Sequence, residues 1–206
     1  MIILKINMMR CFTLCLVMLS VSACKYNVKQ AMENKLIVPD LIPIAPKEML
    51  QVYYPSALKA ELGNELTPTQ VKEQPSVKWN AEPYSFYTLC LTDPDAGPKL
   101  KEFHHWLVGN IPGTEVSRGE TLTEYVGSAT PPKTGLHRYV FLVYKQPSRL
   151  VFTEQHINNR TAETRVKFSI HNFAKKYKLG TPVAGNFYLA QYDDYVPILL
   201  HQLGVQ

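Results

Sequence analysis

The chain has 206 residues and a mass of 23.5 kDa, a length that suggests a single domain. Hydrophobic residues make up 46% and charged residues 19%, a globular composition that argues against disorder or a coiled coil. The net charge of +5 is small and dispersed, and the sequence has neither a basic run nor zinc-finger spacing, so we expect no nucleic-acid partner. Four cysteines are too few for a disulfide-dense scaffold.

Residues 1–23 have the pattern of a secretory signal peptide. Two basic residues precede an apolar run over 11–21, and the small residue Ala23 suits signal peptidase. The run is shorter than the roughly 20 apolar residues of a transmembrane helix. We therefore expect a domain over 24–206 that is secreted after cleavage. An uncleaved membrane anchor, or a lipid on Cys24 in a bacterial source, is the alternative.

Two further residues bear on this secretory interpretation. Asn159 begins the sequon Asn-Arg-Thr, so we expect a glycan on it if the chain enters the secretory pathway. Cys90 lies inside the apolar run FYTLCL, where we expect an inert core residue without a disulfide partner.

The pattern of the remaining chain predicts a mainly β domain with a few helices. A short helix is expected over 27–36, helical spacing recurs over 161–177, and a last short helix is expected near 197–203. Short strands bounded by Pro, Gly or Asp are expected at 51–55, 76–80, 85–92, 104–110, 137–145 and 185–192. Several of these strands are apolar without alternation, which indicates burial on both faces. A large β-sandwich or a mixed sheet with a thick core fits this pattern.

Polar side chains stand at the end of one apolar strand. Asp93 and Asp95 flank Pro94 directly after the run YTLCLT. Because proline fixes φ and lacks an N–H donor, this turn is rigid. The two carboxylates either face a binding site or only cap a surface turn.

Two other strands begin with polar residues. His104 and His105 open one strand and point to opposite faces, so one of them can face a cavity. Adjacent histidines are poor metal ligands without a third, converging ligand, and we expect no metal. His137 and Tyr139 share one face of the other strand, while Arg138 takes the opposite face as a structural partner for Asp93 or Asp95.

Several motifs together resemble the phosphatidylethanolamine-binding protein family, which includes the Raf kinase inhibitor protein and the plant flowering regulators. The matching segments are LTPTQVK (66–72), LTDPDA (91–96), HHWLV (104–108), GLHRYVFLVYKQ (135–146) and KKYKLGTPVAGNFYLAQYDDYVP (175–197). They follow one another in family order and span nearly all of the expected mature domain. The secreted animal branch is the most similar.

The resemblance implies a central antiparallel β-sandwich with peripheral helices and a small anion-binding cavity near the surface. The residues that it implies for the cavity are Asp93, Pro94, Asp95, His105, His137 and Tyr139. In this arrangement Tyr139 donates to a bound oxyanion, and Arg138 supports an aspartate. Two rim loops depart from the family pattern, at Gly97 and at Ala129-Thr130, so the mouth of the cavity is expected to differ.

These features predict a non-catalytic binding protein for small anionic or phospholipid-headgroup ligands such as phosphatidylethanolamine. An acid would hold the amine, and His105 and Tyr139 the phosphate, with affinity rising as pH falls through the histidine range near 6.5. No nucleophile has an evident base beside it, and no cofactor is expected. Membrane contact is at most peripheral. The alternative is a protein-interaction module that inhibits a protease or a kinase.

Overall fold

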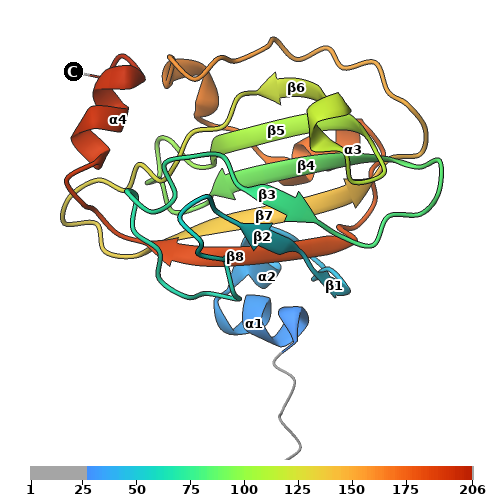
Figure 1. Ribbon diagram of the computed structural model, residues 1–206, viewed down its shortest axis with the longest axis horizontal. Coiled ribbons are helices and arrows are strands. Elements are labelled where there is room, and N and C mark those ends of the chain that lie inside the picture. Colours follow the sequence, from blue (N-terminus) through green and yellow to red (C-terminus); the bar gives the residue numbers. More distant parts are fainter. Residues whose placement is uncertain (1–26, 206) are drawn as a thin grey trace, which may run out of the picture.

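The computed structural model describes residues 27–205 (Figure 1). The signal peptide predicted over 1–23, and Cys24, lie outside this range. Among residues 27–205, every helix is too short or too polar to cross a bilayer.

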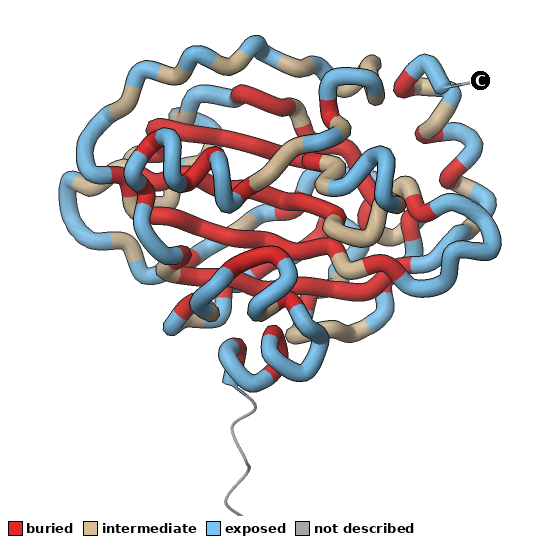
Figure 2. Tube along the Cα trace, turned by 180° about the vertical axis from the view of Figure 1, so that it is seen from behind, coloured by how far each residue is buried: buried red, intermediate tan, exposed pale blue. Residues whose placement is uncertain are grey.

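A six-stranded sheet in the order β1-β8-β7-β4-β5-β6 forms the centre of the molecule. The strands are β1 Glu48–Met49, β4 Phe86–Asp93, β5 Phe103–Pro112, β6 Glu120–Thr123, β7 His137–Lys145 and β8 Ala184–Ala190. Figure 2 shows these strands as nearly continuous bands of buried residues. The mainly β prediction is confirmed, and each strand predicted from 85 onward corresponds to one of β4, β5, β7 and β8.

The family resemblance implied an antiparallel arrangement, but the large sheet is mixed. The short edge strand β1 runs parallel to β8, and the other pairs are antiparallel. The sequence did not predict β1 or the other edge strand, β6. Both are short, with 2 and 4 residues, so neither carries a readable pattern.

A second, two-stranded sheet covers one face of the large sheet (Figure 1). It pairs β2 Gln51–Tyr53 with β3 Ser76–Lys78 in antiparallel fashion. Leu89 and Phe141 point into the core between the two sheets. Their strand neighbours Cys90 and Leu142 point into a second core beneath the helices. Two cores on one sheet explain why its strands are apolar without alternation.

Within residues 27–205, four helices and two 3-10 turns complete the fold. The helices are α1 Val28–Asn34, α2 Ile37–Asp40, α3 Ile170–Lys176 and α4 Val196–Gln202, and the turns are η1 Val116–Arg118 and η2 Glu163–Arg165. Asn27 caps α1 by accepting a 2.8 Å hydrogen bond from the Gln30 N–H. The helices α1 and α3 cover the second core.

The helix predicted over 161–177 is wrong in its first half. Only the single turn Glu163–Arg165 is helical before α3. Lys167 has a φ of 57°, in the left-handed region that a right-handed helix cannot continue through. The next residue, Phe168, lies outside any helix and exchanges two hydrogen bonds with the Glu102 backbone, at 3.0 and 3.1 Å. Pairing with a distant segment therefore overrides the local helical spacing.

Candidate functional site

The topology of the sheet brings the predicted site residues to one edge. In antiparallel pairs the end of one strand lies beside the start of the next, so Asp93 is paired with Phe103 and His137 with Ala190. The arrowheads of β4 and β8 point toward the side of the molecule where α4 lies (Figure 1). Polar residues from three strands therefore meet near the C-terminal helix.

Asp93 and His137 form a buried pair. His137 Nδ1 lies 2.9 Å from Asp93 Oδ2, and each side chain is 5% exposed. The Asp95 backbone N–H donates to Asp93 Oδ1 at 2.7 Å. Burial raises the pKa of Asp93, although the His137 contact opposes this shift. Each carboxylate oxygen keeps a lone pair for a further donor.

Asp95 lies outside the cavity expected from the sequence, because Arg138 binds it. The Arg138 Nε and Nη2 atoms donate to its two carboxylate oxygens at 2.8 and 2.7 Å, and the Arg138 N–H adds a third bond of 2.9 Å. This guanidinium pair lowers the pKa of Asp95 against the effect of burial. Pro94 and Asp95 line a separate polar hollow beside Arg138. The structure thus chooses Asp95 as the partner of Arg138 and leaves Asp93 for the cavity.

His105 presents an acceptor to the cavity, where a donor was expected. Its Nδ1 lies 2.9 Å from the Gly127 carbonyl oxygen, so Nδ1 must carry the proton. The ring is 1% exposed, and burial lowers its pKa to about 3. The neutral ring therefore has an unprotonated Nε2 at neutral pH. His104 points to the other face, where it stacks on Phe168 with ring centroids 4.3 Å apart.

Tyr139 is placed beside His105, but its hydroxyl is occupied. The hydroxyl accepts from the Ala129 N–H at 3.1 Å and lies 2.8 Å from Thr130 Oγ1. Thr130 Oγ1 donates onward to the Ala190 carbonyl, so the Tyr139 proton is directed at Thr130. The Ala129-Thr130 loop, which departs from the family pattern, thus takes up the donor that was assigned to an oxyanion. We do not carry Tyr139 forward as a ligand donor.

A cavity of about 640 Å³ opens over Asp93 and His105. His137 stands behind Asp93 and does not line it. Apolar side chains dominate the walls, among them Leu100, Phe103, Val166, Leu200, Leu203 and Val205. Arg160 and Glu163 are exposed charged groups at the mouth. The cavity is therefore larger and more apolar than the small anion-binding cavity that the family resemblance implied.

Arg165 holds one wall of this cavity and was missed from the sequence. It is fully buried, and its guanidinium donates to the backbone carbonyls of Asn158, Thr161, Glu124, His104 and His105 at 2.8 to 3.3 Å. Burial lowers its pKa to about 10, so it stays charged at neutral pH. These bonds fasten the segment 158–166 to β5. Among residues 27–205 no three His, Cys, Asp or Glu side chains converge as metal ligands would.

Comparison with known proteins agrees with this fold. The family model for phosphatidylethanolamine-binding protein matches residues 56–188. A Drosophila melanogaster protein, provisionally described as odorant-binding protein A5, is 37% identical over 181 residues, which cover 86% of each chain. This chain belongs to the phosphatidylethanolamine-binding protein family.

Two solved structures share the fold. The solution structure of CG7054 is 44% identical, with a TM-score of 0.66, and the match covers 81% of this chain and 97% of that one. Carboxypeptidase Y inhibitor, crystallised with its cognate proteinase, is 25% identical with a TM-score of 0.70, over 83% of this chain and 98% of that one. Of the three relatives, one is thus described as a binding protein and one as an inhibitor.

Proposed function

We propose that the domain over 24–206 is a secreted, non-catalytic binding protein for ligands that carry a primary ammonium next to a phosphate, as phosphatidylethanolamine does. The observation that carries this proposal is the pair of acceptors on the cavity floor, the Asp93 carboxylate and His105 Nε2. Cleavage after Ala23 would deliver the domain outside the cell, and a glycan on Asn159 would follow from the same route.

An ammonium group suits this floor better than a phosphate does. A phosphate offers acceptor oxygens and needs donors, whereas the His105 N–H is already bound to Gly127 and the Tyr139 hydroxyl to Thr130. An ammonium brings three N–H donors and a positive charge to the Asp93 carboxylate. We therefore reverse the orientation expected from the sequence and place the amine innermost.

The phosphate would then lie nearer the mouth. The Arg160 guanidinium forms no ion pair within residues 27–205 and is within the rim of the cavity. The backbone N–H of Ala96, also in the wall, donates to no residue of the described chain. Glu163 faces the same mouth and weakens the local positive charge. Beyond the phosphate, the apolar walls would receive the first carbons of a lipid.

The composition of the cavity favours binding over catalysis. Of the described residues in its lining, none is a serine or a cysteine, and Cys90 is sealed in the core. Asp93 is held by His137, but neither group stands beside a nucleophile that it could activate. We expect no hydrolysis of phosphodiester or peptide substrates incubated with the protein.

Calorimetry with headgroup analogues tests the proposal. We expect phosphoethanolamine to bind more tightly than phosphocholine, whose quaternary ammonium has no N–H, and inorganic phosphate to bind most weakly. Asp93→Asn should weaken phosphoethanolamine about tenfold, which corresponds to the loss of one charged hydrogen bond. The matched control is Asp194→Asn, an exposed acid outside the cavity lining. Inorganic phosphate binding as tightly as phosphoethanolamine would contradict the proposal.

Inhibition of a protease is the second candidate function. It rests on the likeness to carboxypeptidase Y inhibitor, whose structure was solved with a proteinase bound. A kinase target is less compatible with the secreted domain that we propose. The test is inhibition of an extracellular carboxypeptidase in an activity assay. Residual proteolysis that is the same with and without a tenfold excess of the protein would exclude this function for that enzyme.

A further inference from the structure

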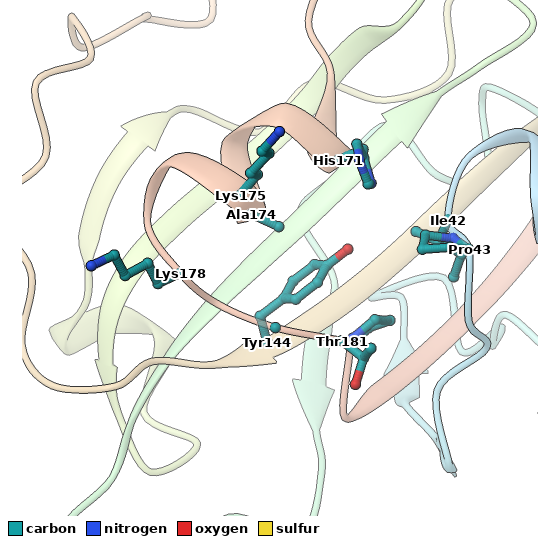
Figure 3. A pocket seen from close by; sticks show the side chains of 10 residues that line it. Ile42, Pro43, Tyr144, His171, Ala174, Lys175, Lys178 and Thr181 are labelled. Carbon is teal, nitrogen blue, oxygen red and sulfur yellow. The ribbon is translucent and has the colours of Figure 1, made fainter.

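A second cavity lies on the other face of the large sheet, far from Asp93. It has a volume of about 350 Å³ and is enclosed by α3, the residues after α2 and the turn that precedes β8 (Figure 3). Its floor is Tyr144, near the end of β7. Seven residues of strand separate Tyr144 from His137, which is roughly 23 Å. Tyr144 also faces the helix-covered core, whereas Tyr139 faces the core between the sheets.

The Tyr144 hydroxyl lacks a partner in the described chain, at a residue that is almost fully buried. The residue is 1% exposed, and its hydroxyl points into the cavity toward the gap between α3 and Ile42 (Figure 3). It makes no hydrogen bond with any of residues 27–205, unlike Tyr125, whose hydroxyl donates to the Val71 carbonyl at 2.6 Å. Burial raises the pKa of Tyr144, so the hydroxyl stays protonated. The hydroxyl is therefore free to donate to whatever occupies the cavity.

The rim of this cavity is basic. His171, Lys175 and Lys178 are exposed on α3 and the turn after it. The lining contains no aspartate or glutamate, and neither lysine forms an ion pair within the described part of the chain. The Lys178 ammonium extends away from Tyr144 in Figure 3, but exposed lysine side chains change rotamer within nanoseconds. The walls that remain are apolar, with Ile42 and Pro43 opposite α3.

We propose that this cavity is a second ligand site, which takes a compact amphiphilic carboxylate. Tyr144 would donate to a carboxylate oxygen, the rim lysines would balance its charge, and Ile42 and Pro43 would contact the apolar body. Charge complementarity selects an anion over a cation of the same shape. The Tyr144 hydroxyl selects an oxygen-bearing ligand over a hydrocarbon, because a hydrocarbon would displace water from the cavity and leave this donor without an acceptor.

Three ligands with the same six-carbon body test this site by calorimetry on the folded protein. We expect hexanoate to bind more tightly than hexanol, and hexylamine to bind most weakly. Tyr144→Phe removes one oxygen atom and should weaken hexanoate at least fivefold, whereas Tyr84→Phe, at a fully exposed position, should not. The double variant Lys175→Gln/Lys178→Gln should reduce hexanoate to the affinity of hexanol and leave hexanol unchanged.

The outcome is independent of the ligand proposed for the Asp93 cavity. His105→Gln should leave hexanoate binding intact, and hexanoate should shift the backbone amide signals of Gly180 and Thr181, which line the site, in NMR spectra of the wild type. Any of three results would overturn the proposal. They are no saturable hexanoate binding, equal hexanoate affinity in the wild type and Tyr144→Phe, and loss of hexanoate binding in His105→Gln.

Discussion

Replacing Arg165 by methionine is expected to destabilise the protein strongly and to weaken ligand binding. Methionine keeps much of the side-chain volume but removes the donors that serve five backbone carbonyls. Three of these bonds are short, at 2.8 to 2.9 Å, to Asn158, Thr161 and Glu124. The carbonyls would remain buried without a donor, which is what makes the substitution costly.

The magnitude follows from these three bonds. Charged hydrogen bonds contribute roughly 1.5 kcal/mol each at the low end, or about 4.5 kcal/mol together. Methionine carries no charge, so the variant avoids the desolvation cost of the buried guanidinium, which offsets part of this loss. We therefore expect a loss of about 3 kcal/mol in the free energy of unfolding. For a domain of this size that corresponds to a decrease in Tm of roughly 6–12 °C.

Thermal and urea unfolding followed by circular dichroism would measure this change. Arg149→Met is the control, because Arg149 is exposed and its side chain makes no hydrogen bond within residues 27–205. Phosphoethanolamine affinity should fall as well, since Arg165 fastens the segment that carries Arg160 and Glu163 at the mouth. If Arg165→Met and Arg149→Met lost the same free energy, below about 1 kcal/mol, the anchoring role of Arg165 would be refuted.

Two further changes test the electrostatics and the loop. Burial lowers the pKa of His104 to about 4 and of His105 to about 3. Near pH 6.5 these histidines are therefore protonated only in the unfolded chain. The free energy of unfolding consequently falls by roughly 2 kcal/mol per histidine between pH 7 and pH 5. Burial raises the pKa of Glu102 to about 7, so between pH 7 and pH 5 this carboxylate is protonated in the folded chain but not in the unfolded chain. Its protonation therefore adds roughly 2 kcal/mol to the free energy of unfolding over the same interval. Glu102→Gln removes this compensation, so the free energy of unfolding measured by urea titration should fall more steeply between pH 7 and pH 5. The same pH dependence in Glu102→Gln and in the exposed control Glu73→Gln would contradict this. Tyr139→Phe should cost about 1–2 kcal/mol through the Ala129-Thr130 loop yet change phosphoethanolamine affinity less than threefold; a tenfold loss would restore Tyr139 as a ligand donor.

The four long strands of the large sheet, β4, β5, β7 and β8, were predictable because nearly all of their residues are buried. The run around Cys90 is apolar on both faces, and the structure gives each face a core of its own. The convergence of Asp93 and His137 follows from the same source, because antiparallel strands bring the end of β4 to the start of β7. Once the strands are recognised, polar residues at their ends can be expected to meet.

The parts that were mispredicted depend on contacts between distant segments. The apolar residues over 161–177 have helical spacing, but Phe168 pairs with Glu102, 66 positions earlier, and this pairing delays the helix to Ile170. The loop over 126–130 sets the roles of His105 and Tyr139. The Gly127 carbonyl accepts the His105 N–H, and the Thr130 hydroxyl accepts the Tyr139 O–H. A sequence pattern can identify the side chains of a site, but it does not show which of their hydrogen-bond donors already have partners in the folded chain.

A crystal structure of the protein soaked with phosphoethanolamine at pH 7 would test the central claim most directly. We predict the ligand nitrogen within hydrogen-bond distance, roughly 3 Å, of both the Asp93 carboxylate and His105 Nε2, with the phosphate toward Arg160. A phosphate group seated on His105, with the amine directed to solvent, would contradict the account.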